Sequence, residues 1–400
     1  MGKAKQPVKM PPTTKWIISF MHGILLLAFT AFWMNTGFTY GDEKLLTKWT
    51  SILKRVVLKI DKDPAKQDYI FINLAYEKAL IPRGNGIGNE VITDRRKLAQ
   101  FFSVLKKNQQ QVKFVVCDVF LQGASPDDSI LKRSVTGINK IVFPTHFQSD
   151  GKVEKLVLSV PSAIADYKII SGGFSKFRIV QDEELSTIPV YLYEKISGRK
   201  LSNGKWFNFD NGTPIINNLI VDYQIRSHEV FEQSEYPVVL LSELMMLPEE
   251  VIINEFLKGR IIVMGDFNSD VHDTVFGSTP GALILLNVFL GLMDGNHLIS
   301  IWWVIFLLVG YTVFSRQMLF PSNVDSKNIK WVGPLLGSVT FLTILSIFSF
   351  MLFDKHIQVL VMTLYISSLR FVIQLRQTKW NWNQTATWLL HLRKTYLSFK

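Results

Sequence analysis

Hydrophobic residues gather in four long runs, and shorter apolar runs separated by polar segments fill the stretch between the first two. The long runs cover residues 16–34, 298–315, 331–353 and 357–375. Each is close to the length of about 20 residues that crosses the hydrocarbon core of a bilayer. We therefore predict four transmembrane helices, one near the N-terminus and three near the C-terminus. No small-x-small cleavage motif follows the first run, which favours a retained signal anchor over a cleaved signal peptide.

The stretch 35–297 alternates between strand-like and helix-like patterns. Short β-branched runs predict strands, and apolar residues at helical spacing predict helices. The predicted strands are 68–76, 112–120, 140–147, 168–171, 215–223 and the run after Gly259; the predicted helices are 93–107, 127–136, 186–196, 236–247 and 248–257. This alternation is typical of an α/β fold with a mainly parallel sheet covered by helices. An amphipathic helix over 41–66 is expected to lead into the domain from the first span.

The formal charge of +11 raises the question of a nucleic-acid partner, and its distribution answers it. Residues 35–297 hold 30 Lys+Arg against 31 Asp+Glu, whereas the rest of the chain holds 14 against 2. The basic excess lies in 1–15, between the second and third spans, and in 376–400, so it flanks the spans. Positively charged loops stay cytoplasmic. We predict both termini in the cytoplasm, an extracytoplasmic domain over 35–297, an amphipathic cytoplasmic tail over 376–400, and no nucleic-acid binding.

Two features that could suggest chemistry have simpler explanations. Gly84, Gly86 and Gly88 have the spacing G-x-G-x-G, and no Lys-Ser/Thr follows, so they are a weak match to a phosphate-binding loop. Cys117, the only cysteine, lies inside an apolar run and is interpreted as a buried small hydrophobe. No nucleophile elbow, kinase motif set or Walker motif is present. We predict no cofactor and assign no catalytic residue.

The stretch 259–314 links the predicted domain to the membrane. A buried strand after Gly259 is followed by a polar loop over 268–280, a leucine-rich helix and then the second span. A shift of that helix would therefore be transmitted to the second transmembrane span.

Several segments resemble the class-two CHASE domain, the cyclase- and histidine-kinase-associated extracellular sensory module of bacteria. ITDRRKLAQFF and VVCDVFLQGASPDDSIL are similar to its early part, and GRIIVMGDFNSDVHDTVFGSTPGALILLNVFLGLMDGNHL to its final strand, Asp…Thr-Pro loop and exit helix. LIVDYQ resembles its Asn-Tyr strand, with Asp222 in place of the usual Asn. The resemblance spans roughly residues 45–375 and implies ligand sensing and signal transmission. Members usually continue into a cytoplasmic kinase or cyclase, so the short tail here implies a separate output partner.

Acidic residues follow two of the predicted strands. Asp118, Asp127 and Asp128 follow the first, and Asp266, Asp270 and Asp273 follow the second. In parallel α/β sheets ligands bind at the carboxyl ends of strands, so neighbouring strands would bring these carboxylates toward a cation or a basic ligand. The simpler alternative is that Asp127 caps a helix and Asp273 orders its own loop. His146 and His272 are the nearest histidines, but their spacing matches no metal-ligand signature, so no metal is predicted.

Three functions remain open at this point. The first is a non-enzymatic sensory or signal-relay protein of the bacterial inner membrane, with the bilayer and an unidentified membrane or periplasmic protein as partners. The second is a structural or scaffold subunit of a cell-envelope complex. The third is an extracytoplasmic enzyme that uses the acidic cluster. Homo-oligomerisation is compatible with each of them.

Overall fold

The computed structural model describes residues 10–36, 41–60, 63–82, 87–121, 123–154, 156, 158–167, 173–181, 185–204, 207–320 and 332–377. The chain forms two compact units. One contains residues 32–305 and 349–356, and the other contains 1–31, 306–348 and 357–400. The predicted strand at 168–171 and most of the predicted tail, 378–400, lie outside the described residues.

A six-stranded, wholly parallel sheet forms the centre of the larger unit. Its strands lie in the order β12 (Val238–Leu240), β1 (Tyr69–Asn73), β13 (Ile261–Gly265), β4 (Phe114–Asp118), β5 (Ile141–Thr145) and β6 (Ser162–Ile164). The residues of β1, β5 and β13 are all buried, as expected for parallel strands covered on both faces. The predicted α/β class with a parallel sheet is confirmed.

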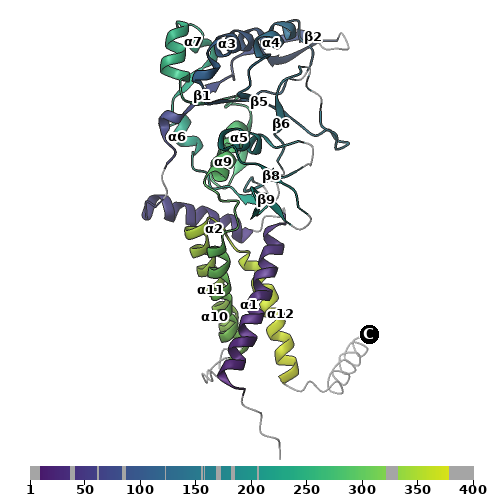
Figure 1. Ribbon diagram of the computed structural model, residues 1–400, viewed down its shortest axis with the longest axis vertical. Coiled ribbons are helices and arrows are strands. Elements are labelled where there is room, and N and C mark those ends of the chain that lie inside the picture. Colours follow the sequence, from purple (N-terminus) through teal and green to yellow (C-terminus); the bar gives the residue numbers. More distant parts are fainter. Residues whose placement is uncertain are drawn as a thin grey trace, which may run out of the picture. The chain divides into compact units, whose positions relative to one another are not determined.

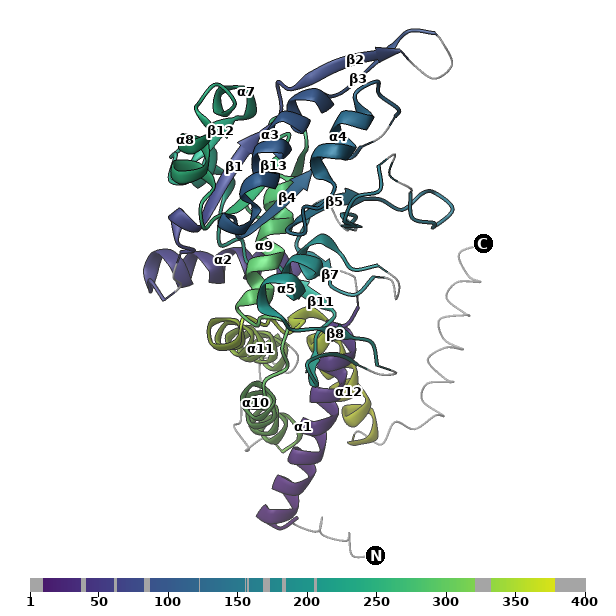
Figure 2. The same ribbon diagram turned by 45° about the horizontal axis from the view of Figure 1, so that its top comes forward.

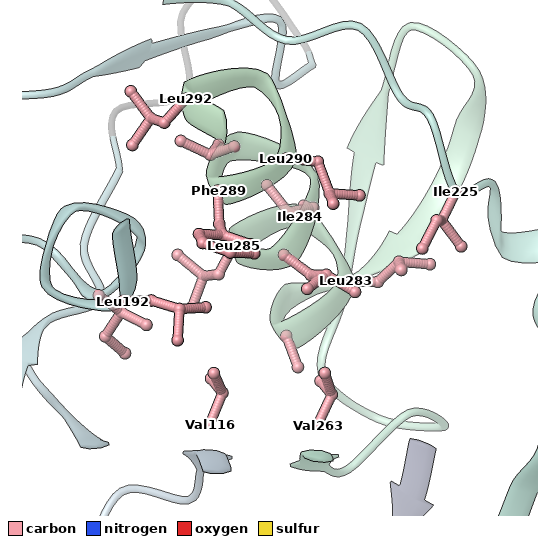
Figure 3. Packing of buried hydrophobic residues seen from close by; sticks show 14 of the residues in the cluster. Val116, Leu192, Ile225, Val263, Leu283, Ile284, Leu285, Phe289, Leu290 and Leu292 are labelled. Carbon is pink, nitrogen blue, oxygen red and sulfur yellow. The ribbon is translucent and has the colours of Figure 1, made fainter. Parts of the chain in front are cut away.

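Helices cover both faces of this sheet (Figures 1 and 2). One face packs against α3 (Arg95–Asn108), α4 (Asp128–Val135), α7 (Leu241–Leu244) and the helical stretch of α8 (Glu249–Val251) and Ile252–Leu257. The other face packs against α5 (Ile188–Ser197) and α9 (Gly281–Met293). Side chains alternate along each strand, so Val116 and Val263 point toward α9 (Figure 3). Twelve of the thirteen residues of α9 are buried, because it is apolar on every side.

Smaller elements complete the larger unit. They are α2 (Gly41–Ile52), which continues into a π-helical turn (Leu53–Val57), the 3-10 helices Lys66–Asp68 and Gln109–Gln111, α6 (Ser227–Phe231), the hairpins β2–β3 (Lys78–Pro82, Asn89–Thr93) and β14–β15 (Val271–Thr274, Gly277–Pro280), the pair β7–β11 (Lys176–Arg178, Asn218–Ile220), and the three-stranded sheet β8–β9–β10 (Leu201–Ser202, Asn208–Asp210, Thr213–Ile215). The predicted 41–66 helix is therefore confirmed over its first part.

Two element predictions are wrong. The apolar run 236–247 was expected to be one helix, but Val238–Leu240 forms edge strand β12 and only Leu241–Leu244 is helical. Pairing with β1 decides this, since a β-branched pair fits a sheet edge well. The polar stretch 268–280 is predicted to be a loop, but it contains the hairpin β14–β15, in which Gly277 has φ 105°. The predicted strand 215–223 is divided, since Ile215 ends β10 and only Asn218–Ile220 of the rest forms a strand, β11.

The smaller unit is built from parts of α1 (Pro12–Met34), α10 (Ile301–Leu319), α11 (Val332–Phe353) and α12 (Val359–Gln377). Each predicted span thus coincides with a helix. Among the described residues, α1 and α10 are long and apolar enough to cross a membrane, while the apolar stretches Gly337–Phe353 and Val359–Val372 are shorter. Within this unit His22 Nδ1 lies 2.8 Å from Ser315 Oγ, so His22 packs against a neighbouring helix.

Candidate functional site

A cavity lies at the carboxyl edge of the central sheet. Strands β4 and β13 are neighbours, and Asp118 at the end of β4 is in register with Gly265 at the end of β13. This is the adjacency that the sequence argument required. The cavity has a volume of about 220 Å³ and is lined by Asp118, His146, Ala165, Asp166, Tyr167, Asp270, His272, Gly281 and Leu285. It follows the general placement of ligand sites in parallel α/β sheets.

Asp118 and Asp270 converge where α9 begins. A Cβ atom added to Gly281, the first residue of α9, would lie 2.5 Å from Asp270 Oδ2 and 3.4 Å from Asp118 Oδ2. The Gly281 N–H donates to the backbone carbonyl of Asp270 at 2.9 Å, which fixes the approach. Any larger residue at this position would push the Asp270 carboxylate away. Gly281 therefore allows two carboxylates to sit together at the positive end of a helix dipole.

Asp118 is the acid whose protonation is most altered. Burial raises its pKa from 3.8 to about 7, and the negative charge of Asp270 adds to the effect. His146 and His272 act in the opposite direction. Near neutral pH this carboxyl group therefore exchanges between its neutral and charged forms, so it can hold a proton or accept a cationic group in its place.

His272 is paired with Asp270. Its Nε2 atom lies 3.0 Å from Asp270 Oδ1, and this hydrogen bond is the main cause of the raised pKa of His272. Tyr167 meets the imidazole edge-on, with ring centroids 5.3 Å apart. Hairpin β14–β15 carries His272 and leads directly into α9, so the positions of the imidazole and of Gly281 are linked through the backbone.

A second histidine–aspartate pair faces the same cavity. His146, just after β5, places Nδ1 2.8 Å from Oδ1 of Asp166, which follows β6. The other Asp166 oxygen accepts the Phe147 N–H at 2.5 Å, so the carboxylate orients the imidazole. Phe120 packs edge-on against His146 with centroids 4.7 Å apart. Neighbouring strands β5 and β6 thus supply one pair, while the loop after β13 supplies the other.

Tyr167 contributes a hydroxyl group without a visible partner. This oxygen is buried and has no hydrogen-bond partner among the described residues. Burial raises the pKa of Tyr167, and the charges of Asp270 and Asp118 raise it further. The phenol is therefore neutral and available to a ligand as donor or acceptor. A buried polar group of this kind is costly unless something satisfies it.

Four of the six predicted acidic residues do not line the cavity, which corrects the prediction of one shared cluster. Asp127 Oδ1 accepts from Arg96 Nη2 at 3.0 Å, and Asp128 pairs with Arg95 and accepts the Ser125 N–H. Asp127 occupies the N-cap position of α4, but its side chain makes no capping hydrogen bond.

The other two residues of this set lie after β13. Asp266 accepts from Lys78 Nζ at 2.7 Å, and the Asp273 Oδ1 atom accepts from Ser278 Oγ across the hairpin at 3.4 Å. Each of these acids therefore has a partner outside the cavity, Asp266 on strand β2 and Asp273 within its own hairpin.

Sequence reasoning missed Asp166 and Tyr167, and it set aside His146 and His272 because of their spacing. All four are brought together by strand order, which spacing along the chain does not encode. One signal was available, since SAIADY has the same form as VVCDV, an apolar run that ends in Asp. Strand β6 is only three residues long, however, and was too short to be recognised.

The cavity side chains differ from those of a preformed metal centre. Within the part of the chain that the structure describes, no three His, Cys, Asp or Glu side chains are placed to hold a metal ion. Both histidines are engaged by carboxylates. The arrangement can instead bind a hydrogen-bond donor or cation, and it can move a proton near neutral pH.

The fold and the cavity define an α/β protein with a polar site at the carboxyl edge of a parallel sheet and two helices able to span a membrane. Comparisons with protein-family models, with curated proteins and with solved structures give no match. The resemblance to the CHASE module therefore stays a prediction.

Proposed function

We propose that this chain is a sensory protein of the bacterial inner membrane whose extracytoplasmic domain binds a small ligand bearing a cationic or hydrogen-bond-donating group. The cavity is the observation that carries the proposal. Its side chains include three carboxyl groups, two imidazoles and the unpartnered Tyr167 hydroxyl, and the described residues that line it include no lysine or arginine. A volume of about 220 Å³ is below the 300–1,000 Å³ typical of drug-sized ligands, so the ligand is small.

A route for transmission starts at the cavity wall. Gly281 and Leu285 line the cavity and belong to α9, and a connection of residues 294–300 joins α9 to α10. A ligand that displaced Asp270 would press on the first turn of α9. Because α9 is buried on all sides, we expect any displacement to move the whole helix as a rigid body.

The connection between α11 and α12 belongs to the larger unit and is hydrogen-bonded to it. Lys54 Nζ donates to Asp354 Oδ1 at 2.5 Å, and Thr50 Oγ1 lies 3.0 Å from His356 Nε2. Trp303 Nε1 donates to Ser349 Oγ at 2.8 Å. Residues within or beside α10, α11 and α12 therefore belong to the larger unit, namely Trp303, Ser349, Asp354 and His356. This supports a relay to a separate membrane or periplasmic partner.

The topology belongs to the same proposal. Four spans, with both termini cytoplasmic and the α/β domain outside, place all three basic segments on the cytoplasmic side. A cysteine replacing Met246, which is 83% exposed, tests this in a Cys117→Ala background. An impermeant maleimide should label it in intact spheroplasts. Labelling only after lysis would reverse the orientation and remove the extracytoplasmic sensor.

The ligand class is tested by thermal unfolding of the full-length protein in lipid nanodiscs. Ethanolamine and 1,4-diaminobutane present ammonium groups with N–H donors, whereas the trimethylammonium group of glycine betaine is bulkier and has no N–H donor. A ligand at 100 times its Kd stabilises by about 2.7 kcal/mol, which is about 5–10 °C in Tm for a domain of this size. We expect at least one of the two amines to shift Tm, and betaine to shift it less.

The matched variants are Asp118→Asn and Asp266→Asn. Both remove one carboxylate beside the sheet edge, but only Asp118 lines the cavity. The shift should disappear in the first variant and persist in the second. Equal shifts in both variants, or no shift with any of the three compounds, would reject a cation-binding cavity.

A second candidate function is acid–base catalysis in the same cavity. The observation that favours it is Asp118, whose pKa of about 7 suits proton transfer at neutral pH, beside two carboxylate-oriented imidazoles. An enzyme would turn a bound amine over. Incubation of the full-length protein with each compound, followed by mass spectrometry, should recover it unchanged if the protein is a sensor; a product formed by the parent chain and lost in Asp118→Asn would establish an enzyme.

A further inference from the structure

Helix α2 (Gly41–Ile52) buries its polar face in the larger unit and exposes its apolar face, which is the opposite of an ordinary surface helix. Its buried residues are all polar, namely Glu43, Thr47, Thr50 and Ser51. Its outward face is apolar: Leu45 is 58% exposed, Trp49 63% and Val56, in the following turn, 61%. Leu45, Trp49, Ile52 and Val56 recur at i, i+4, i+7 and i+11, which is one stripe along a helix.

The polar face is fixed inward by specific contacts within the folded unit. Lys176 Nζ pairs with Glu43 Oε2 at 2.8 Å, and both side chains are at most 5% exposed. Ser51 Oγ donates to Asp222 Oδ1 at 2.8 Å. A rotation of α2 that hid the apolar stripe would separate a buried ion pair and leave each charge uncompensated. The outward direction of the apolar stripe is therefore built into the fold.

We propose that α2 and the turn after it lie in the membrane interface, with the stripe of Leu45, Trp49, Ile52 and Val56 inserted among lipid acyl chains. The inference rests on the membrane insertion proposed above. A reversed helix exposes apolar surface to water in a soluble unit, whereas in the interface the same surface is buried. Trp49 and the exposed Lys48 beside it are the residue types that favour the headgroup level.

The lipid surface fits this face better than a second copy of the chain because of chain continuity. Helix α1, which can span a membrane, ends at Met34, and α2 begins at Gly41. Residues 35–40 give a reach of about 25 Å at most. The start of α2 therefore cannot leave the neighbourhood of the membrane surface once α1 is inserted.

The test uses nitroxide labels on single cysteines in the Cys117→Ala full-length protein, reconstituted into liposomes of phosphatidylethanolamine and phosphatidylglycerol. Labels replace Leu45, Trp49 and Val56. Met246, 83% exposed on the folded unit, is the aqueous reference, and Val309, 59% exposed on α10, is the lipid reference. Each labelled protein must keep the parent Tm within about 3 °C. If the protein labelled at position 49 unfolds, the labels at positions 45 and 56 alone provide the test.

We expect the α2 labels to collide with a soluble nickel chelate at least fivefold less often than the label at 246, and with oxygen more often than that label. Nickel collision rates equal to those at 246 would overturn the inference. Low nickel access combined with spin–spin broadening would also overturn it, in favour of a second copy. If the label at 309 is itself water-exposed, membrane insertion fails, and the proposed function with it.

Discussion

Acidic residues follow strands β4 and β13 in two different settings. Asp128 and Asp266 meet arginine or lysine, whereas Asp118 and Asp270 meet each other and histidine. The pKa of Asp266 is lowered by Lys78 in spite of burial, while that of Asp118 rises to about 7. A neighbouring arginine or lysine keeps a carboxylate ionised, so that the pair has a structural role. A carboxylate beside histidine and a second carboxylate can instead change its protonation state near neutral pH.

The difference teaches how to separate a site from a cluster of acids in this fold. Acidic residues that follow the same strand have different neighbours. After β4, Asp118 lines the cavity and Asp128 pairs with Arg95; after β13, Asp270 lines the cavity and Asp266 pairs with Lys78. Two features distinguish the cavity: the described residues that line it include no lysine or arginine, and the Tyr167 hydroxyl has no hydrogen-bond partner among the described residues.

The largest effect is expected for Asp128→Ala. Arg95, whose side chain is 1% exposed, would keep its bond to the Gly123 carbonyl and the attraction of Glu90, and it would lose the Asp128 carboxylate. Breaking a buried pair on one side costs about 3 kcal/mol, or about 6–12 °C in Tm for a domain of this size. Thermal unfolding measures it. Asp127→Ala is the control, because its partner Arg96 is 67% exposed, and its cost should stay below about 1 kcal/mol. Equal costs would remove the distinction between the two pairs.

Asp118→Asn should instead stabilise the protein at high pH. The folded-state pKa of about 7 lies above the ordinary value of 3.8, so the contribution of Asp118 is fully present below pH 4 and is lost as pH rises through 7. At pH 8 the variant avoids a desolvated charge, and we expect a gain of about 2 kcal/mol that vanishes near pH 4. Urea unfolding across this pH range measures it.

Asp266→Asn is the opposite-signed control for that experiment. The pKa of Asp266 is lowered, so its carboxylate stabilises the folded state at neutral pH and stops doing so as pH falls through the folded pKa. The variant should be less stable than the parent at pH 8 and equal to it at low pH. A loss of stability in both variants at pH 8 would mean that Asp118 is only another scaffold acid.

More of the fold than of the site can be predicted from the sequence. Buried β-branched runs such as 261–265 and the all-round apolar α9 identified the parallel sheet and its cover, because burial on both faces leaves a strong pattern. Strand order, which puts β13 between β1 and β4, depends on pairing between distant segments. Asp118 and Asp270 were predicted because they share that edge. Asp166 was missed because β6 is held by its neighbour β5 and has too short a pattern of its own.

A smaller effect is expected on His272 when Asp270 is changed. The Asp270 hydrogen bond is the main cause of its raised pKa, so Asp270→Asn should bring that pKa back toward 6.5. The free energy of unfolding should change by less than about 1 kcal/mol, because both side chains are partly exposed. Histidine-selective NMR titration measures the change in the pKa of His272. Gly281→Ala should act in the same direction, since its Cβ would displace the Asp270 carboxylate.

The smallest effect is expected for Lys78→Ala. Lys78 is 38% exposed, so its pair with Asp266 is largely screened and should contribute about 0.5 kcal/mol, falling further at 1 M salt. Asp266 keeps the backbone N–H groups of Asn268 and Ser269, so its loop should hold its shape without the lysine. Urea unfolding at low and high salt measures the change. A cost near that of Asp128→Ala would show that exposed lysine partners and buried arginine partners cannot be ranked by exposure. In that case Asp266 would belong with the buried scaffold acids.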